Sequence, residues 1–550
     1  MSSIGLFAYK GTAPAQRDFL YTKLLDNPPR VMSVDIETVS LKDRRIIGVG
    51  FGLSPTEALY VPRHSEEFYT AITMLCDPGI TKIYHNVLFD LPQLYDLCPE
   101  IDSENTLCTM LMCVMEGLPV DLAGIAFHLG RNIKRIADIL PKGMTMDQLE
   151  DSVVADKCLD DCMATMLVYE SVYPHINQEY FSREMALVPV LMKMSRRGIK
   201  IDQQRREELE ERLKTEVDFY LSLAEAEGFN PASTQQVAYV LMQKGCRVPV
   251  EWRNGKFSAS TDEEVLRRID NPWAALVLNY RKVSKMLGTY IKPYKGLARG
   301  YTRFHMNAAT GRISSTQRNM QNIPPEASNP DPVNNPGPRT MFLPDSGVWT
   351  DFDNSQQELR TLAYRSQDPE LLHVYEKELD VHQYFANFAG IPRKVCKNVN
   401  FAAIYGASDE TINETAGFNN MRRAHEIGVM WRTLFKRAAV WIDETQEQGI
   451  ADGFVTTIGG RRLWLPGEDV ERESDRRRKA VNYSIQGSAA ELVKAQMLLC
   501  AGRGYDLALQ VHDELVIDGH IEEEELRGLG LENVGPFKCP IDVKYVERWE

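Results

Sequence analysis

Two acidic segments separated by 160 residues constrain this chain more than any other feature of its sequence. Asp353 follows the apolar run 347–349, and Asp513 follows the apolar run 507–509. Each run is typical of a β-strand, so each acid is expected near a strand end. Two such acids brought together would bind a pair of hard divalent ions. Such a pair stabilises the charge that develops on the attacking and leaving oxygens when a phosphoryl group is transferred.

The length and composition are those of a multidomain globular protein. With 550 residues the chain is too long for a single core, so about two to four domains are expected. No run approaches about 18 consecutive apolar residues, which argues against a membrane span, and residues 1–20 lack the pattern of a secretory signal. The ten cysteines include no C-x-x-C pair, which favours reduced thiols in a cytosolic setting and no zinc site.

Charge is distributed unevenly along the chain. The net charge of −14 argues against a nucleic-acid partner, yet residues 281–318 contain nine Lys or Arg residues and no acid. A second basic cluster covers residues 476–479. A basic track on an acidic protein is either a groove for phosphates or a solvated helix face, and charge alone does not decide between the two.

Strand-like patterns dominate the first part of the chain and helical periodicity dominates the rest. Residues 1–183 are expected to form a mixed α/β domain with strands at 31–36, 46–51, 58–61 and 81–85 and a final helix at 161–173. Further helices are expected at 184–195, 204–226 and 274–290, with a Pro- and Asn-rich loop at 324–338. The expected order is then a strand before Asp353, a largely helical block to about 450, a hairpin at 453–465, a helix at 476–500 and strands around Asp513.

Four acids of the first domain stand where their side chains can meet. Asp35 and Glu37 lie two residues apart on one expected strand, so they point to the same side. Asp90 lies on the first turns of one expected helix, and Asp161 lies on another. Four such acids can hold two Mg²⁺ ions and hydrolyse a phosphodiester with an activated water. Each acid alone is better explained as a surface or capping residue, but their order and local contexts favour a site.

The segments around these acids resemble the motifs of DEDD-type 3′→5′ proofreading exonucleases. Residues 35–37 and 85–90 match D-x-E and H-N-x-x-F-D in full. The third motif, Y-x-x-x-D, ends at Asp161 but has Lys157 in place of the tyrosine, which in the family helps to position the attacking water. The resemblance implies a ribonuclease H-like domain with catalytic metal ligands at Asp35, Glu37, Asp90 and Asp161. We expect a working exonuclease with an altered rate.

A four-residue repeat stands out in the segment 393–406. Arg393, Lys397, Phe401 and Tyr405 share one face of an expected helix, with two cations followed by two aromatic rings. Cations can clamp a triphosphate, and aromatic rings can stack on a base and sugar. The alternative is a buried amphipathic helix, which two buried cations fit poorly.

The C-terminal pattern resembles family A DNA polymerases. Segments 351–360 and 509–515 are similar to motifs A and C of that family, and segment 393–406 is similar to motif B, R-x₃-K-x₃-F-x₃-Y-G. The resemblance implies two Mg²⁺ ions per active site, with Mn²⁺ as a substitute, held here by Asp353 and Asp513. Each site of the chain, including the exonuclease site, is expected to take such a pair.

The same resemblance implies roles for further residues. Glu514 and Lys397 would join the two metal ligands as catalytic residues. Glu358 would crowd a ribose 2′-hydroxyl, and Arg312 would reach the minor groove, whose acceptors vary little with sequence. The expected nucleotide-binding residues are Gln357, Glu358, His382, Arg393, Lys397, Phe401 and Tyr405. The expected DNA-binding residues are Arg312, Arg478, Asn482, Gln486, Gln510 and His512.

The resemblance covers about residues 30–550 and implies a fold of α/β and α+β type with several domains. A ribonuclease H-like exonuclease domain over 1–183 would precede a right-hand polymerase domain over 184–550. The expected subdomains are a thumb at 184–300, a palm at 301–360 and 473–550, and fingers at 361–472. Because only about 30 residues precede the matched region, no 5′-nuclease domain is expected.

The expected partners follow from the same resemblance. They are primer–template DNA and dNTPs, with a helicase and a single-strand binding protein as candidate accessory proteins. The chain is expected to act as a cytoplasmic monomer away from membranes, and its size is typical of a bacteriophage replicative enzyme. Two other interpretations are a nuclease whose second half only holds DNA and a catalytically silent DNA-binding scaffold. A silent scaffold predicts eroded acids at both sites, and the acids of both sites are present.

Overall fold

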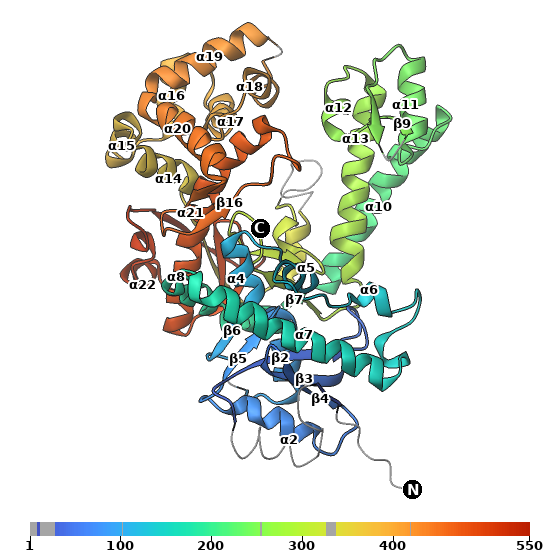
Figure 1. Ribbon diagram of the computed structural model, residues 1–550. Helices are drawn as coiled ribbons and strands as arrows, with labels where there is room; N and C mark the ends of the chain where they lie inside the picture. Colours follow the sequence, from blue (N-terminus) through green and yellow to red (C-terminus); the bar gives the residue numbers. More distant parts are fainter. Residues whose placement is uncertain are drawn as a thin grey trace.

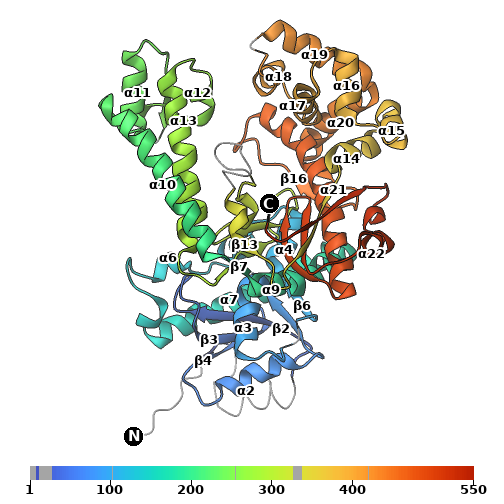
Figure 2. The ribbon, with the colours of Figure 1, turned by 180° about the vertical axis from the view of Figure 1, so that it is seen from behind.

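The computed structural model describes residues 8–10, 28–101, 103–253, 256–325, 337–418 and 420–549. A sheet-based N-terminal domain lies at one end of the molecule, and a helical arm and a helical lobe rise apart from each other at the other end (Figure 1). The view from behind shows the same separation of arm and lobe (Figure 2). Most of the loop predicted at 324–338 lies outside the described residues.

The N-terminal domain is built on a six-stranded mixed sheet with the order β1-β4-β3-β2-β5-β6. Strands β1 to β4 pair antiparallel, and β5 and β6 continue the sheet in parallel from β2. The four strands predicted from the apolar runs are confirmed. The strands are β1 Ala8–Lys10, β2 Val31–Thr38, β3 Ile46–Ser54, β4 Glu57–Pro62, β5 Thr81–Tyr84 and β6 Thr106–Cys108.

Helices cover this sheet and bring two acids of the N-terminal domain close to β2. The long helix α7, Asp151–Val172, crosses β2, β3 and β4, and α3, Val87–Leu97, packs near β5 and β6. Both helices include predicted site residues, so the topology delivers acids from separate elements to the centre of the sheet. The other helices of this domain are α2 Phe68–Thr73, α4 Thr109–Glu116, α5 Leu122–His128 and α6 Ile136–Ile139.

Two short helices connect the N-terminal domain to the rest of the chain. The helix predicted at 184–195 is confirmed over most of its length by α9, Leu187–Arg197, and its first two residues end the preceding helix α8, Gln178–Met185. Pro189 lies in the first turn of α9 and has no N–H to donate to the preceding turn, so the helix restarts there.

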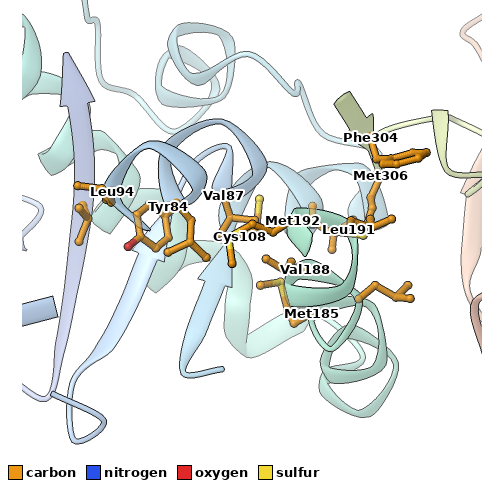
Figure 3. Packing of buried hydrophobic residues seen from close by; sticks show 14 of the residues in the cluster. Tyr84, Val87, Leu94, Cys108, Met185, Val188, Leu191, Met192, Phe304 and Met306 are labelled. Atoms are coloured by element: carbon orange, nitrogen blue, oxygen red, sulfur yellow. The ribbon is translucent and has the colours of Figure 1, made fainter. Parts of the chain in front are cut away.

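The junction between the two halves is an apolar contact. Met185, Val188, Leu191 and Met192 of α8 and α9 lie against Tyr84, Val87 and Cys108 of the N-terminal domain and against Phe304 and Met306 (Figure 3). These residues belong to one continuous hydrophobic cluster that also contains Phe352 and Leu515 of the second sheet. The core therefore runs without interruption from the N-terminal domain to the strands that carry the C-terminal acids.

The helical arm consists of two long helices and a small tip. Helices α10, Gln203–Ala226, and α13, Pro272–Lys285, pack along each other, and α13 continues as a π-helical turn, η5, Met286–Ile291. The helices predicted at 204–226 and 274–290 are therefore confirmed. The tip contains α11 Thr234–Gln243, α12 Glu263–Arg267 and a hairpin of β8 Val250–Arg253 and β9 Lys256–Ala259.

The second sheet has four antiparallel strands in the order β17-β18-β14-β19. The 31-residue helix α21, Glu473–Arg503, contacts strand β17. Strands are confirmed before Asp353 and on both sides of Asp513. Their bounds are β14 Trp349–Asn354, β17 Asp506–Val511, β18 Glu514–Asp518 and β19 Ile541–Val546, and α22 Glu523–Gly528 lies in the connection to β19.

The helical lobe occupies the chain between β14 and α21. The predicted helical block and the hairpin at 453–465 are both confirmed. The helices are α14 Gln357–Ser366, α15 Pro369–Glu376, α16 Val381–Ala389, α17 Arg393–Ile404, α18 Asp409–Ala416, α19 Met421–Leu434 and α20 Lys436–Asp452, and the hairpin strands are β15 Phe454–Thr456 and β16 Arg462–Trp464. Among the helices of the described ranges, none combines the length and the apolar character that a bilayer span requires.

Short strands complete the base of the molecule. A three-stranded sheet joins the start of the arm to the chain before β14, and a hairpin follows the arm. The strands are β7 Ile199–Ile201, β10 Arg299–Gly300, β13 Phe342–Leu343, β11 Arg303–His305 and β12 Ser314–Thr316.

Candidate active sites

The acids of the C-terminal site meet at one edge of the second sheet. In β14, Asp353 stands opposite Glu514 of β18 and opposite Asp542 of β19. Asp513 lies in the turn between β17 and β18, and Asn354 holds that turn through its side-chain amide, which donates to the Asp513 carbonyl oxygen at 3.0 Å. The register of the sheet therefore brings the two acids predicted from the sequence into one cluster.

This cluster carries more negative charge than its surroundings compensate. Burial and the neighbouring Asp353 raise the pKa of Asp513 to about 6. Burial, followed by the charges of Asp542 and Glu514, raises the pKa of Asp353 as well. Close carboxylates that disfavour their own ionisation are hard oxygen donors that a divalent cation stabilises, so the residues present fit a metal site.

Asp353, Asp513 and Asp542 line a cavity of about 520 Å³. His382 of α16 and Arg393, Lys397 and Phe401 of α17 line the same cavity. A cavity lined by both acids and cations fits a ligand that carries both metal-binding and anionic groups. The other predicted residues that line the cavity are Arg312, Gln357, Glu358, Gln510 and His512.

A buried hydrogen-bond chain orients His382. The indole N–H of Trp431 donates to Asn400 Oδ1 at 3.0 Å, and Asn400 Nδ2 lies 2.9 Å from His382 Nδ1. Because the indole can only donate, the Asn400 amide nitrogen must donate to Nδ1, which leaves the ring hydrogen on Nε2. Burial also lowers the pKa of His382 to about 4, so the ring is neutral near pH 7 and offers one N–H donor.

A second network holds the predicted ribose-discriminating acid. Arg312 Nη2 donates to Glu358 Oε1 at 2.6 Å, and the Tyr405 hydroxyl donates to the other carboxylate oxygen. Gln486 on α21 donates to the same hydroxyl at 3.4 Å. Glu358 is thus fixed at the cavity by three elements that are far apart in the chain. The Tyr405 hydroxyl serves this network, while Phe401 lines the cavity itself.

Glu514, a predicted catalytic acid, is held by two partners from distant parts of the chain. Its carboxylate accepts hydrogen bonds from Arg339 at 3.1 Å and from the indole N–H of Trp549 at 2.8 Å. The Arg339 guanidinium stacks over the Trp549 ring at 4.2 Å. Glu514 lies on β18 opposite Asp353 and, among the described residues, does not line the cavity. Its direct catalytic role stays a prediction.

Three of the predicted DNA-binding residues, Arg312, Gln510 and His512, line the cavity. Gln510 donates to the His512 carbonyl oxygen at 2.8 Å, and His512 adopts a left-handed backbone with φ of +58° in the turn that carries Asp513. Such a conformation is strained for a side chain like histidine and is common at functional sites. Arg478, Asn482 and Gln486 follow one another at helical spacing on α21.

Ion pairs occupy the second basic cluster. Arg476 pairs with Glu468 at 3.1 Å, Arg477 with Glu447 at 2.6 Å, Arg478 with Asp475 and Lys479 with Glu471. These pairs favour the interpretation of residues 476–479 as a charge-balanced helix face over that of a phosphate groove.

Three residues of the C-terminal site were missed by sequence reasoning. Asp542 faces Asp353 from β19, and Asn400 and Trp431 orient His382. The pairing of Asp542 depends on strand register, which no local pattern gives. Asn400 directly precedes Phe401 on the recognised helix and is fully buried in the structure. The available sequence signal was a polar residue beside the four-residue repeat.

The four acids predicted in the N-terminal domain also come together. Asp35 and Glu37 lie on β2, Asp90 accepts a hydrogen bond from the Ile36 backbone, and Asp161 faces them from α7. Burial and the charge of Asp161 raise the pKa of Asp35 to about 7. Burial likewise raises the pKa values of Glu37 and Asp90, with further contributions from the neighbouring carboxylates.

This second cluster fits a divalent cation and contains a lysine. Ligand atoms of Asp35, Glu37 and Cys158 all lie within 4.8 Å of one another. Within the described ranges, Asp161 Oδ1 is buried and has no hydrogen-bond partner, so one donor is open to a cation. The other oxygen of Asp161 accepts from the ammonium of Lys157. Burial disfavours the charged lysine, but the charges of Asp161, Glu37 and Asp35 outweigh it and raise the pKa of Lys157.

Comparison with known proteins identifies the family of the chain. Residues 200–533 match the model of "DNA polymerase family A". The chain belongs to this family. Residues 15–149 match a model described as "3′-5′ exonuclease", so an exonuclease domain precedes the polymerase domain. That match ends before α7, the helix that carries Lys157 and Asp161.

Relatives of this family A chain include bacterial enzymes. It is 28% identical over 551 residues to DNA polymerase I of Pseudomonas aeruginosa, covering 89% of the chain and 59% of that protein. It is 32% identical over 417 residues to the thermostable DNA polymerase I of Thermus filiformis, covering 68% of the chain and 49% of that protein. The chain therefore spans about half to three fifths of the length of these relatives. The expectation of a bacteriophage source stays a prediction.

A solved structure shows the same fold. The polymerase domain of Pol1 from M. smegmatis, solved in complex with DNA primer-template and dNTP, superposes with a TM-score of 0.76 and 21% sequence identity. The match covers 98% of this chain and 99% of that one. The mixed α/β fold with several domains is thereby confirmed over nearly the whole length.

Proposed function

We propose that the chain is a template-directed DNA polymerase that extends a primer 3′ end with dNTPs, and that its N-terminal domain is a 3′→5′ proofreading exonuclease. The observation that supports this most strongly is the single cavity that Asp353, Asp513, Arg393 and Lys397 all line. A triphosphate needs cations along its length and acids that hold metal at its reacting end. Both requirements are met within one cavity of suitable size.

The acids and the cations that line the cavity have separate tasks. Asp353 and Asp513 would hold two Mg²⁺ ions, with Mn²⁺ as a substitute, and these ions would supply charge stabilisation at the attacking and leaving oxygens. Arg393, Lys397 and the Nε2–H of His382 would bind the triphosphate. Arg393 now pairs with Asp380 at 2.5 Å, so nucleotide binding would recruit a cation that α16 already positions.

The remaining groups would select the substrate and align the primer. Phe401 would stack on the incoming nucleotide, and Gln357 would support it from α14, where its amide is anchored to the Ala489 carbonyl oxygen at 3.0 Å. Glu358 would exclude a ribose 2′-hydroxyl, because Arg312 and Tyr405 leave it no freedom to move aside.

The DNA would lie between the arm and the lobe, against Gln510, His512 and α21. On this proposal the thumb covers 184–300, the palm 301–360 and 473–550, and the fingers 361–472. The exonuclease domain would cover 1–183, with Asp35, Glu37, Asp90 and Asp161 as its metal ligands. We further propose that the protein acts as a cytoplasmic monomer and that a helicase and a single-strand binding protein assist it.

Primer extension on a matched template with dNTPs and Mg²⁺ tests the proposal. Asp353→Ala should reduce extension by roughly 10³-fold or more, because it removes a metal ligand from the transition state. Asp35→Ala should leave extension unchanged. A nuclease whose second half only holds DNA would not extend the primer at all, and a silent scaffold would neither extend nor shorten it. Extension that survives Asp353→Ala would contradict the proposal.

A further inference from the structure

Lys157 is a buried cation inside the N-terminal cluster of acids. It lies on α7 one helical turn before Asp161, and only 8% of its side chain is exposed. Its ammonium donates to Asp161 Oδ2, and Asp35 and Glu37 are its other close charges. Buried lysines are rare unless an acid compensates them, so this contact is built into the site and is not an incidental surface pair.

The charges of the site limit how many divalent ions it can hold. The Lys157 ammonium already compensates part of the negative charge of these carboxylates. A second divalent ion bound at Asp161 would lie beside this ammonium. Like charges repel strongly in a buried site of low dielectric constant, and the second ion would also lose Asp161 Oδ2, which the lysine already uses.

We infer that the Lys157 ammonium takes the place of one of the two metal ions and that the exonuclease site binds a single divalent cation. Asp35 and Glu37 on β2 are the nucleus of the remaining cation site, with Cys158 beside them. The free oxygen of Asp161 completes it from α7. This inference rests on the proposed exonuclease function and specifies how its site is charged.

The number of Mn²⁺ ions bound per chain tests the inference without a measurement of catalysis. The full chain would carry Asp353→Asn and Asp513→Asn to remove the polymerase metal ligands, and bound Mn²⁺ would be counted by electron paramagnetic resonance. An oligonucleotide with a non-hydrolysable 3′-terminal linkage would be present. We expect one Asp35-dependent Mn²⁺ in this chain and two after Lys157→Met. The Mn²⁺ ion that the chain binds with Lys157 intact should bind roughly tenfold or more tightly in Lys157→Met, because the ammonium is gone.

Matched variants separate the site from general charge effects. Lys157→Arg keeps the cation and should bind one ion, and Lys134→Met removes one exposed positive charge of the same domain and should also bind one. If Lys157→Met does not fold, Lys157→Gln takes its place. The count of one Mn²⁺ in the chain with Lys157 intact is a test that needs no Lys157 variant. Two Asp35-dependent ions in the presence of Lys157 would overturn the inference alone. A number of bound Mn²⁺ ions that is unchanged by Asp35→Ala would overturn the proposed exonuclease site as well.

Discussion

The two acidic sites of this chain are compensated in opposite ways. In the C-terminal site the cations Arg393 and Lys397 of α17 line the same cavity, of about 520 Å³, as Asp353 and Asp513. In the N-terminal site the cation Lys157 contacts the acid Asp161 directly and is buried with it. Both clusters start from a strand that ends in acids, and both raise the pKa values of those acids through burial.

The position of the counter-charge decides what each site can accept. A cavity lined by both cations and metal-binding acids leaves space for an anionic ligand that contacts both, as a nucleoside triphosphate requires. A cation that is hydrogen-bonded to a metal ligand leaves space for a phosphodiester only at the surface of the acid cluster. It also lowers the number of metal ions that the cluster binds. On the proposed function, this difference suits the C-terminal site to synthesis and the N-terminal site to hydrolysis.

Removing a cation that lines the proposed polymerase cavity should have the largest effect on nucleotide incorporation. We expect Lys397→Ala to lower kcat/KM for dNTP by roughly 10²- to 10³-fold, because the triphosphate loses a cation that stabilises its charge in the transition state. Lys394→Ala is the matched control, since Lys394 is exposed on the same helix. Single-nucleotide incorporation measures both. Equal losses in the two variants would break the comparison, because the position of the cation would then not matter.

The acid beside the cavity should control sugar selection. Glu358→Ala should reduce the preference for dNTP over rNTP by roughly 10- to 100-fold, since the 2′-hydroxyl would then meet space in place of a fixed carboxylate. The preference is the ratio of the two kcat/KM values. Glu376→Ala, an exposed acid of the same lobe, serves as the control. An unchanged ratio after Glu358→Ala would mean that the sugar is selected elsewhere.

The orientation of His382 offers a subtler test. Trp431→Phe removes the N–H that fixes the Asn400 amide, so we expect KM for dNTP to rise by roughly fivefold with kcat nearly unchanged, as for one lost hydrogen bond. Trp441→Phe is the control within the same lobe. If both tryptophan variants raise KM equally, the hydrogen-bond chain does not orient the ligand-binding imidazole.

The pH dependence should show the smallest effect. Burial lowers the pKa of His382 to about 4, so the imidazole stays neutral across pH 6–8 and gains charge only on acidification toward that value. The ratio of kcat/KM between the unchanged chain and His382→Ala should therefore vary by less than about twofold from pH 8 to pH 6. A ratio that climbs as pH falls through about 6.5 would indicate a histidine with an ordinary pKa.

Local patterns predicted the residues of both sites better than their contacts. Strand ends and four-residue helical spacing were enough to find Asp353, Arg393 and Lys397, because both signals lie within one segment. The contact of Asp542 with Asp353 depends on the register of β14 against β19, and the placement of Glu514 depends on Arg339 and Trp549 from distant parts of the chain. These contacts arise only when separate elements pack, so single-segment reasoning could not supply them.

The most direct test of the two-site account is the fate of a primer with one mismatched 3′ nucleotide, in the presence of dNTPs and Mg²⁺. The unchanged chain should remove the mismatch and then extend the primer. Asp353→Asn should only shorten the primer, and Asp35→Asn should only extend it, with the mismatch retained in the product. Extension by Asp353→Asn at the rate of the unchanged chain, or removal of the mismatch by Asp35→Asn at that rate, would contradict the account.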